Sequence, residues 1–511
     1  MKKITAVLLA ALLLSGCNSP SVPNISPSET ITENTQATGS SRFDMVTEIM
    51  LSDSGIRVNG GGETDAVFAT GDIIYYEDRE TYDSGNPYGE GTAEERHSAE
   101  EAAAHTVVNI TQPGAYRVTG KLSKGQIRVD LGEDAEEDPN AVVELILADA
   151  DITCTVAPAI LFQNVYACDE DASEETATAD VDTSSAGANL ILEGKNTING
   201  SHVAKIFKDK DGEKKLWKQD AAIYSYMSMN IDGPGILTLT ADNEGLGSEM
   251  HLTINGGNIS IEAQNDGINT NEDGVSVTTI NGGSIGISAG LGAEGDCIDS
   301  NGYLVINDGH IIAFANPKSD GGLDSDLGTF IHGGSVVAMG SGMNSIAADS
   351  QQSTMILHFA TPQSPRSEII LTRQDGTVVF SFEADNAYDR PYSTLILASA
   401  ALEQGETYHV SVNGVPMGYT GNDAGRGPGG KMPGDARPED IEPPKDFDPN
   451  RMEGRGPRPD DMPPETFDGQ ELPKMPEGSF GGRGTPASGE KRTDFYMNDK
   501  VNVFSGVIAA E

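Results

Sequence analysis

Carboxylate side chains recur at fixed distances from apolar residues in the middle of the chain. When the segments that precede Ile-Asn-Gly-Gly and its variants are aligned, acidic residues stand two positions before a shared apolar residue. This first column holds Glu244, Asp266 and Asp296, with Asp320 one place out of register. The position directly after the apolar residue forms a second column, which holds Gly247, Asn269, Asp299 and Asp324, and Asp326 ends the last of these runs.

Two neighbouring columns of acidic residues need charge compensation. If the aligned segments are stacked strands, the residues of one column lie about 4.8 Å apart, and carboxylates at that distance repel each other by a few kcal/mol at an effective dielectric constant of about 20. Their oxygens suit Ca²⁺, and no clustered Cys or His would suit a softer metal. We therefore expect calcium ligands at Glu244, Asp266, Asp296, Asp299, Asp320, Asp324 and Asp326. The alternative is that these residues only form turns and accept backbone N–H groups.

An internal repeat predicts the elements that position these side chains. Segments beginning at Ile254, Ile280, Ile306 and Ile331 read Ile-Asn-Gly-Gly or a close variant, and their spacings are 26, 26 and 25 residues. Each is followed by a stretch in which apolar residues alternate, as in a strand with one buried face. Asn and Gly are expected to supply positive φ angles at the corners. We predict an all-β chain whose body is a right-handed parallel β-helix with coils of about 26 residues.

The first residues have the features of a bacterial lipoprotein signal. Lys2 and Lys3 precede an apolar run that is too short to span a bilayer and that ends in Leu-Ser-Gly-Cys at residues 14–17. This ending resembles the lipobox, in which the Cys thiol receives a diacylglycerol and the preceding peptide is removed. We therefore expect a lipid anchor at Cys17 that holds the protein to the cell membrane on its extracytoplasmic face. The alternative is an ordinary cleaved signal peptide followed by a chance Cys.

Composition and strand patterns divide the remaining chain. Residues 17–43 are rich in Ser, Thr, Asn and Pro, whereas Gly and Pro dominate a stretch near the C-terminus, so neither segment is expected to pack a core. The expected order is a signal peptide (1–16), a flexible tether (17–43), the β-helix (44–349), a small β module (350–418), a disordered Gly/Pro-rich segment (419–492) and a terminal strand-like segment (493–511).

The charge of the chain excludes one class of partner. Among 511 residues, 79 Asp and Glu outnumber 33 Lys and Arg, and the formal net charge is -46. Nucleic acid repels such a polyanion, so a nucleic-acid partner is excluded. Removal of the signal leaves Cys154, Cys168 and Cys297, and this odd number predicts no disulfide framework.

Several motifs together resemble a bacterial carbohydrate-binding β-helix family founded on a clostridial cellulose-associated protein. They are the Ile-Asn-Gly-Gly segments, the acidic runs at residues 265–268, 295–303 and 319–326, and the Pro-Gly-Ala-Tyr-Arg-Val-Thr-Gly segment at residues 113–120. The resemblance covers residues 45 to 415. It implies a calcium-containing parallel β-helix, similar in architecture to pectate and other polysaccharide lyases, that binds cellulose-type or acidic, pectin-like polysaccharides.

These observations predict a surface-anchored protein that binds polysaccharide with the help of calcium. One alternative is a polysaccharide lyase, in which calcium neutralises a uronate and a base removes the adjacent proton. Lys318 is the candidate base, because it is the only basic residue that the sequence places near the acidic columns. A third possibility is a structural adhesin or stalk. Trp217, the only Trp of the chain, lies in a Lys-rich segment that could stack on an acidic sugar or could simply be a solvated insertion.

Overall fold

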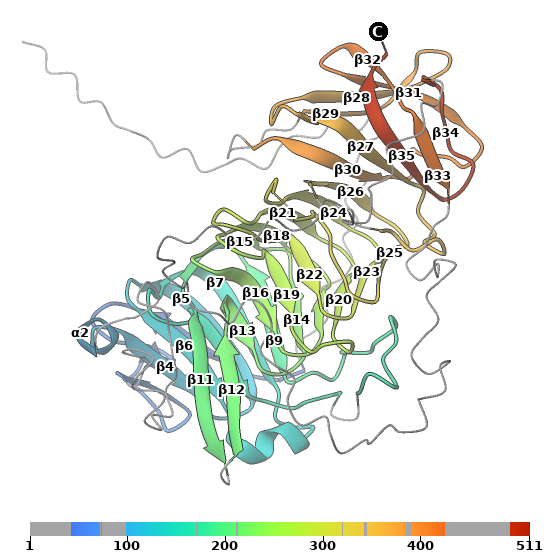
Figure 1. The fold of residues 1–511 in the computed structure, drawn as a ribbon. Coiled ribbons are helices and arrows are strands. Elements are labelled where there is room, and N and C mark those ends of the chain that lie inside the picture. Colours follow the sequence, from blue (N-terminus) through green and yellow to red (C-terminus); the bar gives the residue numbers. More distant parts are fainter. Residues whose placement is uncertain are drawn as a thin grey trace, which may run out of the picture. The chain divides into compact units, whose positions relative to one another are not determined.

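The described part of the chain consists almost entirely of β-strands. The computed structural model describes residues 42–71, 73, 99–169, 172–210, 213–318, 320–341, 345–383, 390–424 and 491–510. Within these residues, helix is confined to α2 (Ala99–Ala103) and a 3₁₀ helix at Glu133–Glu137. The strands form large mixed sheets that contain both parallel and antiparallel pairs (Figure 1). The chain is therefore an all-β protein.

One sheet of eight strands carries the acidic columns. Its first two strands are antiparallel, and each later strand is parallel to the strand before it. In spatial order the strands are β3 (Val67–Thr70), β4 (Thr106–Ile110), β6 (Gly125–Asp130), β8 (Ile160–Asn164), β13 (Ala221–Ser225), β16 (Glu244–Ser248), β19 (Ile268–Thr270) and β22 (Ile298–Ser300).

Three longer parallel strands come first in the other sheet, and two separate rows of parallel strands continue from the last of them. The three longer strands are β1 (Val46–Leu51), β5 (Gly114–Leu122) and β7 (Val143–Thr153), which pair in this order. β7 bends at Asp149, whose φ of 60° lies in the left-handed region and whose carboxylate accepts the N–H of Lys195 at 2.8 Å. Residues before the bend pair with one strand, β9 (Ala188–Glu193), and residues after it pair with the next, β10 (Lys195–Gly200).

Each of these two strands begins a row that continues to the end of the repeats. Both rows are parallel throughout. The row from β9 contains β14 (Met229–Asp232), β17 (Leu252–Ile254), β20 (Val277–Ile280), β23 (Tyr303–Ile306) and β25 (Gly328–Ile331). The row from β10 contains β15 (Ile236–Ala241), β18 (Asn258–Ala263), β21 (Ser284–Ser288), β24 (His310–Phe314) and β26 (Ser335–Gly340).

The Ile residues of the aligned segments lie side by side. Ile254 pairs with Ile280, Ile280 with Ile306, and Ile306 with Ile331. The register is therefore the one that the sequence alignment assumes. The corners differ from the expectation in one respect, because among the described non-Gly residues only Asn59, Asp149 and Asn413 have positive φ. The Gly that ends each segment adopts positive φ instead, and the preceding Asn residues do not.

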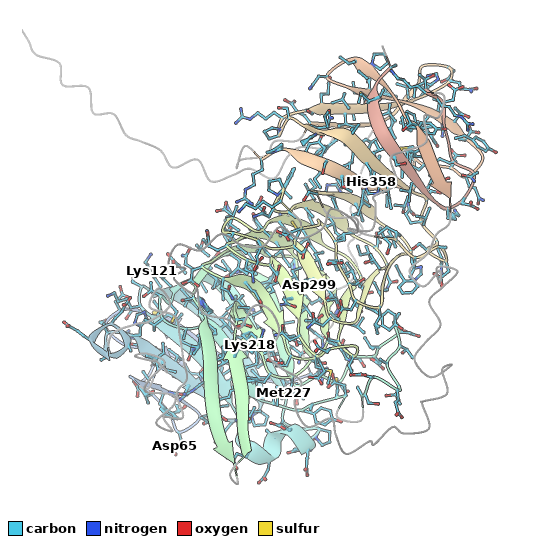
Figure 2. All side chains as sticks on the ribbon, viewed as in Figure 1. Asp65, Lys121, Lys218, Met227, Asp299 and His358 are labelled. Atoms are coloured by element: carbon cyan, nitrogen blue, oxygen red, sulfur yellow. The ribbon has the colours of Figure 1, made fainter. Side chains whose placement is uncertain are left out.

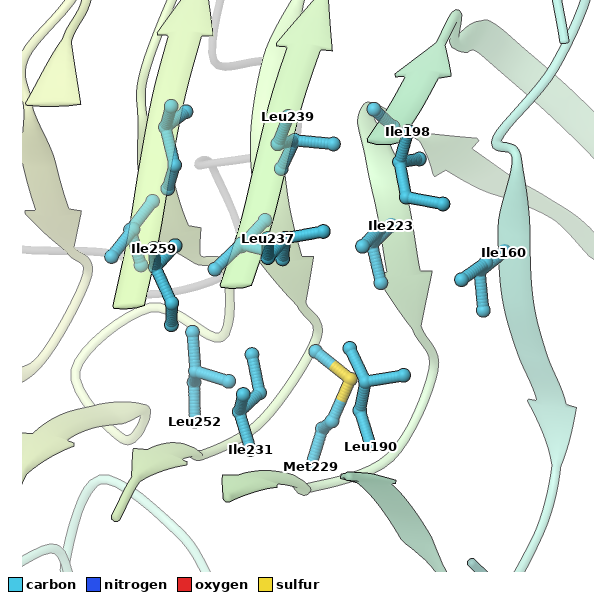
Figure 3. Close-up of a cluster of buried hydrophobic side chains, with 14 of the residues drawn as sticks. Ile160, Leu190, Ile198, Ile223, Met229, Ile231, Leu237, Leu239, Leu252 and Ile259 are labelled. Atoms are coloured by element: carbon cyan, nitrogen blue, oxygen red, sulfur yellow. The ribbon is translucent and has the colours of Figure 1, made fainter. Parts of the chain in front are cut away.

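Side chains from all three parallel rows meet in one hydrophobic core (Figure 3). Ile223 comes from the eight-stranded sheet, Ile231 from the row of β9, and Leu239 from the row of β10; all three are fully buried. Burial of each such side chain contributes about 1.5–3 kcal/mol to folding. This core explains why apolar residues alternate along the strands.

The residues after β26 form a mostly antiparallel module. β30 (Tyr392–Ala398) pairs with both β26 and β27 (Thr354–Gln363), and β35 (Val501–Ala509) lies parallel to β27. The remaining strands are β28 (Glu368–Arg373), β29 (Val378–Glu383), β31 (Thr407–Val412), β32 (Val415–Gly418), β33 (Gly421–Ala424) and β34 (Phe495–Tyr496). A second core joins this module to β24 and β26 through Ile312, Phe314, Val337 and Met339. The strands β24 and β26 are therefore buried on both faces.

Two short elements lie beside these sheets. β2 (Arg57–Val58) pairs with β1, and β11 (Val203–Lys210) forms a hairpin with β12 (Glu213–Gln219). In the part of the chain that is described, no helix is long and apolar enough to cross a membrane. The signal peptide, Cys17, nearly all of the tether and residues 425–490 lie outside the described residues, so the expectations for them stay predictions.

Candidate functional site

The strand register brings the two acidic columns together on the eight-stranded sheet. Leu246, Ile268 and Ile298 occupy one column, and Gly247, Asn269 and Asp299 occupy the next. Backbone hydrogen bonds of the same parallel register connect β22 to the next segment. The N–H of Asp324 donates to the carbonyl of Ile298 at 2.7 Å, and the N–H of Asp326 donates to the carbonyl of Ser300 at 3.1 Å. Asp324 is therefore the next member of the second column.

Glu244 is the most deeply buried carboxylate of the first column. One oxygen, Oε1, accepts the side-chain amide of Asn269 at 3.0 Å. The other oxygen, Oε2, and Oδ1 of Asn269 are buried without a hydrogen-bond partner among the described residues. Burial, followed by the carboxylates of Asp220 and Asp266, raises the pKa of Glu244 well above its usual range. Burial of such polar atoms is costly unless a partner binds them.

Asp266 and Asp296 link consecutive strands through the backbone. The N–H of Asp296 donates to Asp266 at 2.7 Å, and the N–H of Gly321 donates to Asp296. Burial raises the pKa of Asp266 to about 7 and that of Asp296 to about 8, despite these hydrogen bonds to the charged forms. Asp320, which is out of register in the sequence, accepts the N–H of Gly295 at 2.9 Å.

The second column becomes more exposed toward its end. Burial, with further contributions from the carboxylates of Asp324 and Asp326, raises the pKa of Asp299 to about 6. Asp324 is exposed and accepts the N–H of Ser325 at 2.9 Å, which is typical of a turn residue. Burial and the neighbouring Asp324 also raise the pKa of the exposed Asp326. The turn interpretation thus fits Asp324 better than it fits Asp299.

A lysine that the sequence analysis missed lies near these carboxylates. Lys218, near the end of β12, forms an ion pair with Asp220 at 2.7 Å. Its charge opposes the raised pKa values of Glu244, Asp266 and Asp299. Lys218 and Asp299 are labelled in Figure 2. The prediction that Lys318 is the only basic residue near the acidic columns is therefore wrong. The cause is the pairing of the next strand, since β13 begins at Ala221, three residues after Lys218, and Ala221 pairs with Glu244 of β16.

The two other sequence candidates lie in different surroundings. Lys318 is exposed, and its ammonium donates to the backbone carbonyl of Ala293 at 3.3 Å. Trp217 pairs with Ile206 across the β11–β12 hairpin, while its side chain lies outside the described parts. The remaining cysteines, Cys154, Cys168 and Cys297, are free thiols.

The described residues do not form a metal site made of carboxylates alone. Among them, no group of three or more His, Cys, Asp and Glu side chains is arranged to hold a metal ion. A cation at the columns would therefore need ligands besides carboxylates. Asn269 Oδ1 and Glu244 Oε2 are buried oxygens that lack partners, and backbone carbonyls and water are further ligands that Ca²⁺ accepts.

A large cavity lies along a different part of the molecule. It has a volume of about 1100 Å³ and is lined by residues of β7, β9, β14, β17, β20 and β23, together with residues 179–184 and Arg42. Thr183 connects the segment 179–184 to β14 and β17. Its hydroxyl forms hydrogen bonds with Asn230 Oδ1 at 2.7 Å and with the Thr253 hydroxyl at 2.8 Å. The sequence analysis did not identify this cavity, because its lining joins residues up to 290 positions apart.

Comparison with known proteins identifies the family. Residues 104–361 match the family described as carbohydrate-binding domain-containing protein. The chain belongs to this carbohydrate-binding domain family. The matched region contains the eight-stranded sheet from β4 onward, both acidic columns and most of the residues that line the cavity. Separately, residues 1–18 match a prokaryotic membrane lipoprotein lipid attachment site, which supports membrane anchoring at Cys17.

Two individual proteins are also similar to this member of the family. A carbohydrate-binding domain-containing protein of Acetivibrio thermocellus is 31% identical over 157 residues, which cover 30% of this chain and 45% of that protein. The chain thus spans less than half the length of this relative. A solved structure described as a polysaccharide lyase-like protein from C. thermocellum, gadolinium derivative, aligns with a TM-score of 0.34 and 21% identity, over 60% of this chain and 98% of that chain.

Proposed function

We propose that the protein is a lipid-anchored, calcium-dependent polysaccharide-binding protein on the extracytoplasmic face of the cell membrane. The observation that carries this proposal is membership of the carbohydrate-binding domain family over residues 104–361. The lipoprotein attachment site at residues 1–18 supports the anchor. The three parallel rows, whose register repeats every 25 or 26 residues between Ile254 and Ile331, support a right-handed parallel β-helix as the scaffold.

Calcium is the second part of the proposal. The donor chemistry at the columns fits a hard cation, because the candidates are carboxylate and amide oxygens and two of these oxygens are buried without partners. Glu244, Asp266, Asn269 and Asp299 would hold the ion, and Asp296, Asp320, Asp324 and Asp326 would extend the site. Bound calcium supplies positive charge that neutralises these carboxylates and can also bind a uronate of the polysaccharide.

The charge balance explains why an acidic polysaccharide would need the cation. A chain with a formal net charge of -46 repels a polyuronate, and salt screens this repulsion only beyond about 8 Å. Lys218 is already paired with Asp220. Short-range coordination through calcium is therefore the interaction that would overcome the repulsion at this sheet.

The test is binding of the purified full-length protein to polygalacturonate, measured with millimolar Ca²⁺ and with EGTA. We expect retention with Ca²⁺, loss in EGTA, and persistence of binding in moderate salt. The double variant Asp266→Asn, Asp299→Asn should lose binding, whereas Asp134→Asn, an exposed residue of the 3₁₀ helix, should not. Equal retention in EGTA and Ca²⁺ would overturn the calcium proposal. Formation of unsaturated uronate products would show a lyase in place of a binding protein.

A further inference from the structure

A polar face runs along the row of strands from β14 to β25. The residue directly after the buried paired Ile of each strand belongs to one column, which lies at or just beyond the strand ends and holds Asp232, Asn255, Asn281, Asn307 and His332. Because side chains alternate along a strand, this column projects to the face opposite the core. All five residues line the cavity of about 1100 Å³.

The three Asn side chains form a hydrogen-bonded ladder. Nδ2 of Asn281 donates to Oδ1 of Asn255 at 2.9 Å, and Nδ2 of Asn307 donates to Oδ1 of Asn281 at 2.8 Å. Each amide has two N–H donors and two acceptor lone pairs, so every step of the ladder leaves a donor and an acceptor for another molecule. All three side chains are exposed. Successive amides are thus held in fixed orientations about 4.8 Å apart, a spacing close to one sugar unit of an extended chain.

Aromatic rings continue this face at one end. The Phe330 ring lies 6.0 Å from the Tyr303 ring and 5.9 Å from the imidazole of His332, and the planes of Phe330 and His332 are inclined by only 31°. Nδ1 of His332 is buried and has no hydrogen-bond partner among the described residues. A pyranose ring presents apolar C–H faces and polar hydroxyl edges. Aromatic rings beside a line of amides complement both surfaces.

The charge of the cavity selects against an acidic ligand. Among the described residues that line it, five are carboxylates and one, Arg42, is basic. One of these carboxylates, Glu193, forms an ion pair with Arg117. The backbone N–H of Arg42 donates to Glu144 at 3.0 Å, and its guanidinium donates to the carbonyl of Ser184. The cavity therefore carries a net negative charge that repels a uronate and leaves a neutral, hydroxyl-rich chain as the compatible ligand.

From these features we propose that the face formed by Asn255, Asn281, Asn307, Phe330 and His332 binds a neutral polysaccharide chain without calcium. This deepens the proposed function and rests on it, since it assigns two classes of glycan to two different sheets. The acidic columns would bind the acidic polysaccharide through calcium, and the amide ladder would bind the neutral polysaccharide directly.

The experiment measures binding of cellohexaose and of polygalacturonate by the full-length protein and its variants. We expect cellohexaose to bind equally in EGTA and in Ca²⁺. Phe330→Ala and, separately, Asn281→Ala should each weaken this binding by about tenfold or more. Tyr496→Ala, which removes an aromatic ring that is 48% exposed on β34, is the matched control and should leave it unchanged.

Polygalacturonate binding in Ca²⁺ reports whether each variant is folded. If Phe330→Ala and Asn281→Ala keep that binding and lose cellohexaose, the proposed face is supported. If both variants bind cellohexaose like the parent protein, or if the parent binds only polygalacturonate, this inference is overturned and the proposed function stands. If the parent protein binds neither glycan, both proposals fail.

Discussion

Buried and half-buried carboxylates with raised pKa values are the main feature at the scale of single residues. Glu244, Asp266, Asp296 and Asp299 all have a raised pKa, and burial is the largest cause for each of them. A carboxyl group whose pKa is higher in the folded state than in the unfolded state stabilises the fold below its unfolded pKa. This contribution is lost as the pH rises through the folded pKa.

The first prediction is a pH dependence of stability that calcium reverses. Without Ca²⁺, the free energy of unfolding should fall between about pH 4 and pH 8, because Asp299, Asp266 and Asp296 lose protons at pKa values of about 6, 7 and 8. Urea unfolding in EGTA at several pH values measures this fall. With Ca²⁺ at a hundredfold excess over Kd, the ion should add about 2.7 kcal/mol near neutral pH. Identical curves in EGTA and Ca²⁺ would refute calcium binding.

The second prediction concerns Glu244 itself. Glu244→Gln keeps the side-chain size and removes the ionisable group, so this variant should be at least as stable as the parent in EGTA but should gain less from Ca²⁺. Thermal unfolding with and without Ca²⁺ gives both quantities. The exposed Asp324→Asn is the matched comparison from the second column and should change the stability in EGTA by less than about 0.5 kcal/mol. If Ca²⁺ stabilises Glu244→Gln as much as it stabilises the parent protein, Glu244 is not a calcium ligand.

At the scale of elements, close approach of neighbouring strands restricts residue size. A Cβ atom on Gly267 would lie 2.3 Å from Cγ2 of Ile287 and 2.6 Å from the carbonyl oxygen of Cys297. A Cβ atom on Gly286, in β21, would have no atom within 4 Å. Gly267 thus marks a point where two of the parallel rows leave no space for a side chain.

This contrast gives the third prediction. Gly267→Ala should destabilise the protein by about 1–3 kcal/mol through overpacking, whereas Gly286→Ala should be neutral or slightly stabilising. Denaturant midpoints of the two single variants in the same buffer provide the comparison. Equal midpoints for both variants would show that the backbone at Gly267, directly before β19, can move away from β21 at little cost.

At the scale of the whole molecule, the last strand returns to complete the C-terminal module. β35 lies parallel to β27 with Val501 beside Thr354, and Phe504 is fully buried in the second core. Residues nearly 150 positions apart in the sequence therefore share one sheet. The module also buries one face of β24 and β26, so its loss would expose apolar side chains of the parallel rows.

The fourth prediction tests this long-range closure. Phe504→Ala should cost about 3–5 kcal/mol, because a large side chain is removed from a packed core. Ile508→Ala, in the same strand at a residue that is 40% exposed, should cost much less. Hydrogen exchange should also show faster exchange in β27 and β30 for Phe504→Ala. A variant that unfolds like the parent would mean that β35 contributes little to the module.

The fifth prediction concerns attachment of the whole protein to the membrane. Cys17→Ser removes the thiol that would carry the lipid, so the protein should move from the membrane fraction to the soluble or secreted fraction. Cell fractionation of the variant and the parent measures this change. Glycan binding by the released protein serves as the control for folding. Unchanged membrane partitioning would contradict the lipid anchor.

The sequence alone determined the β character, the register of the aligned segments and the identity of the acidic columns. These properties are local or periodic, because alternation reports a buried face and a fixed spacing reports which strands lie side by side. Leu246, Ile268 and Ile298 occupy one column as the alignment assumed. The Asn ladder was present in the same repeat, but the Asn residues were interpreted only as corner residues.

Only the tertiary structure decided which distant residues complete the sites. Lys218 lies near the acidic columns because β13, which follows it, pairs with β16. Residues 179–184 line a cavity together with strands that range from β7 to β23. The raised pKa of Asp296, about 8, depends on burial and on neighbouring charges. Loop paths and burial arise from packing between segments far apart in sequence, and no local spacing encodes them.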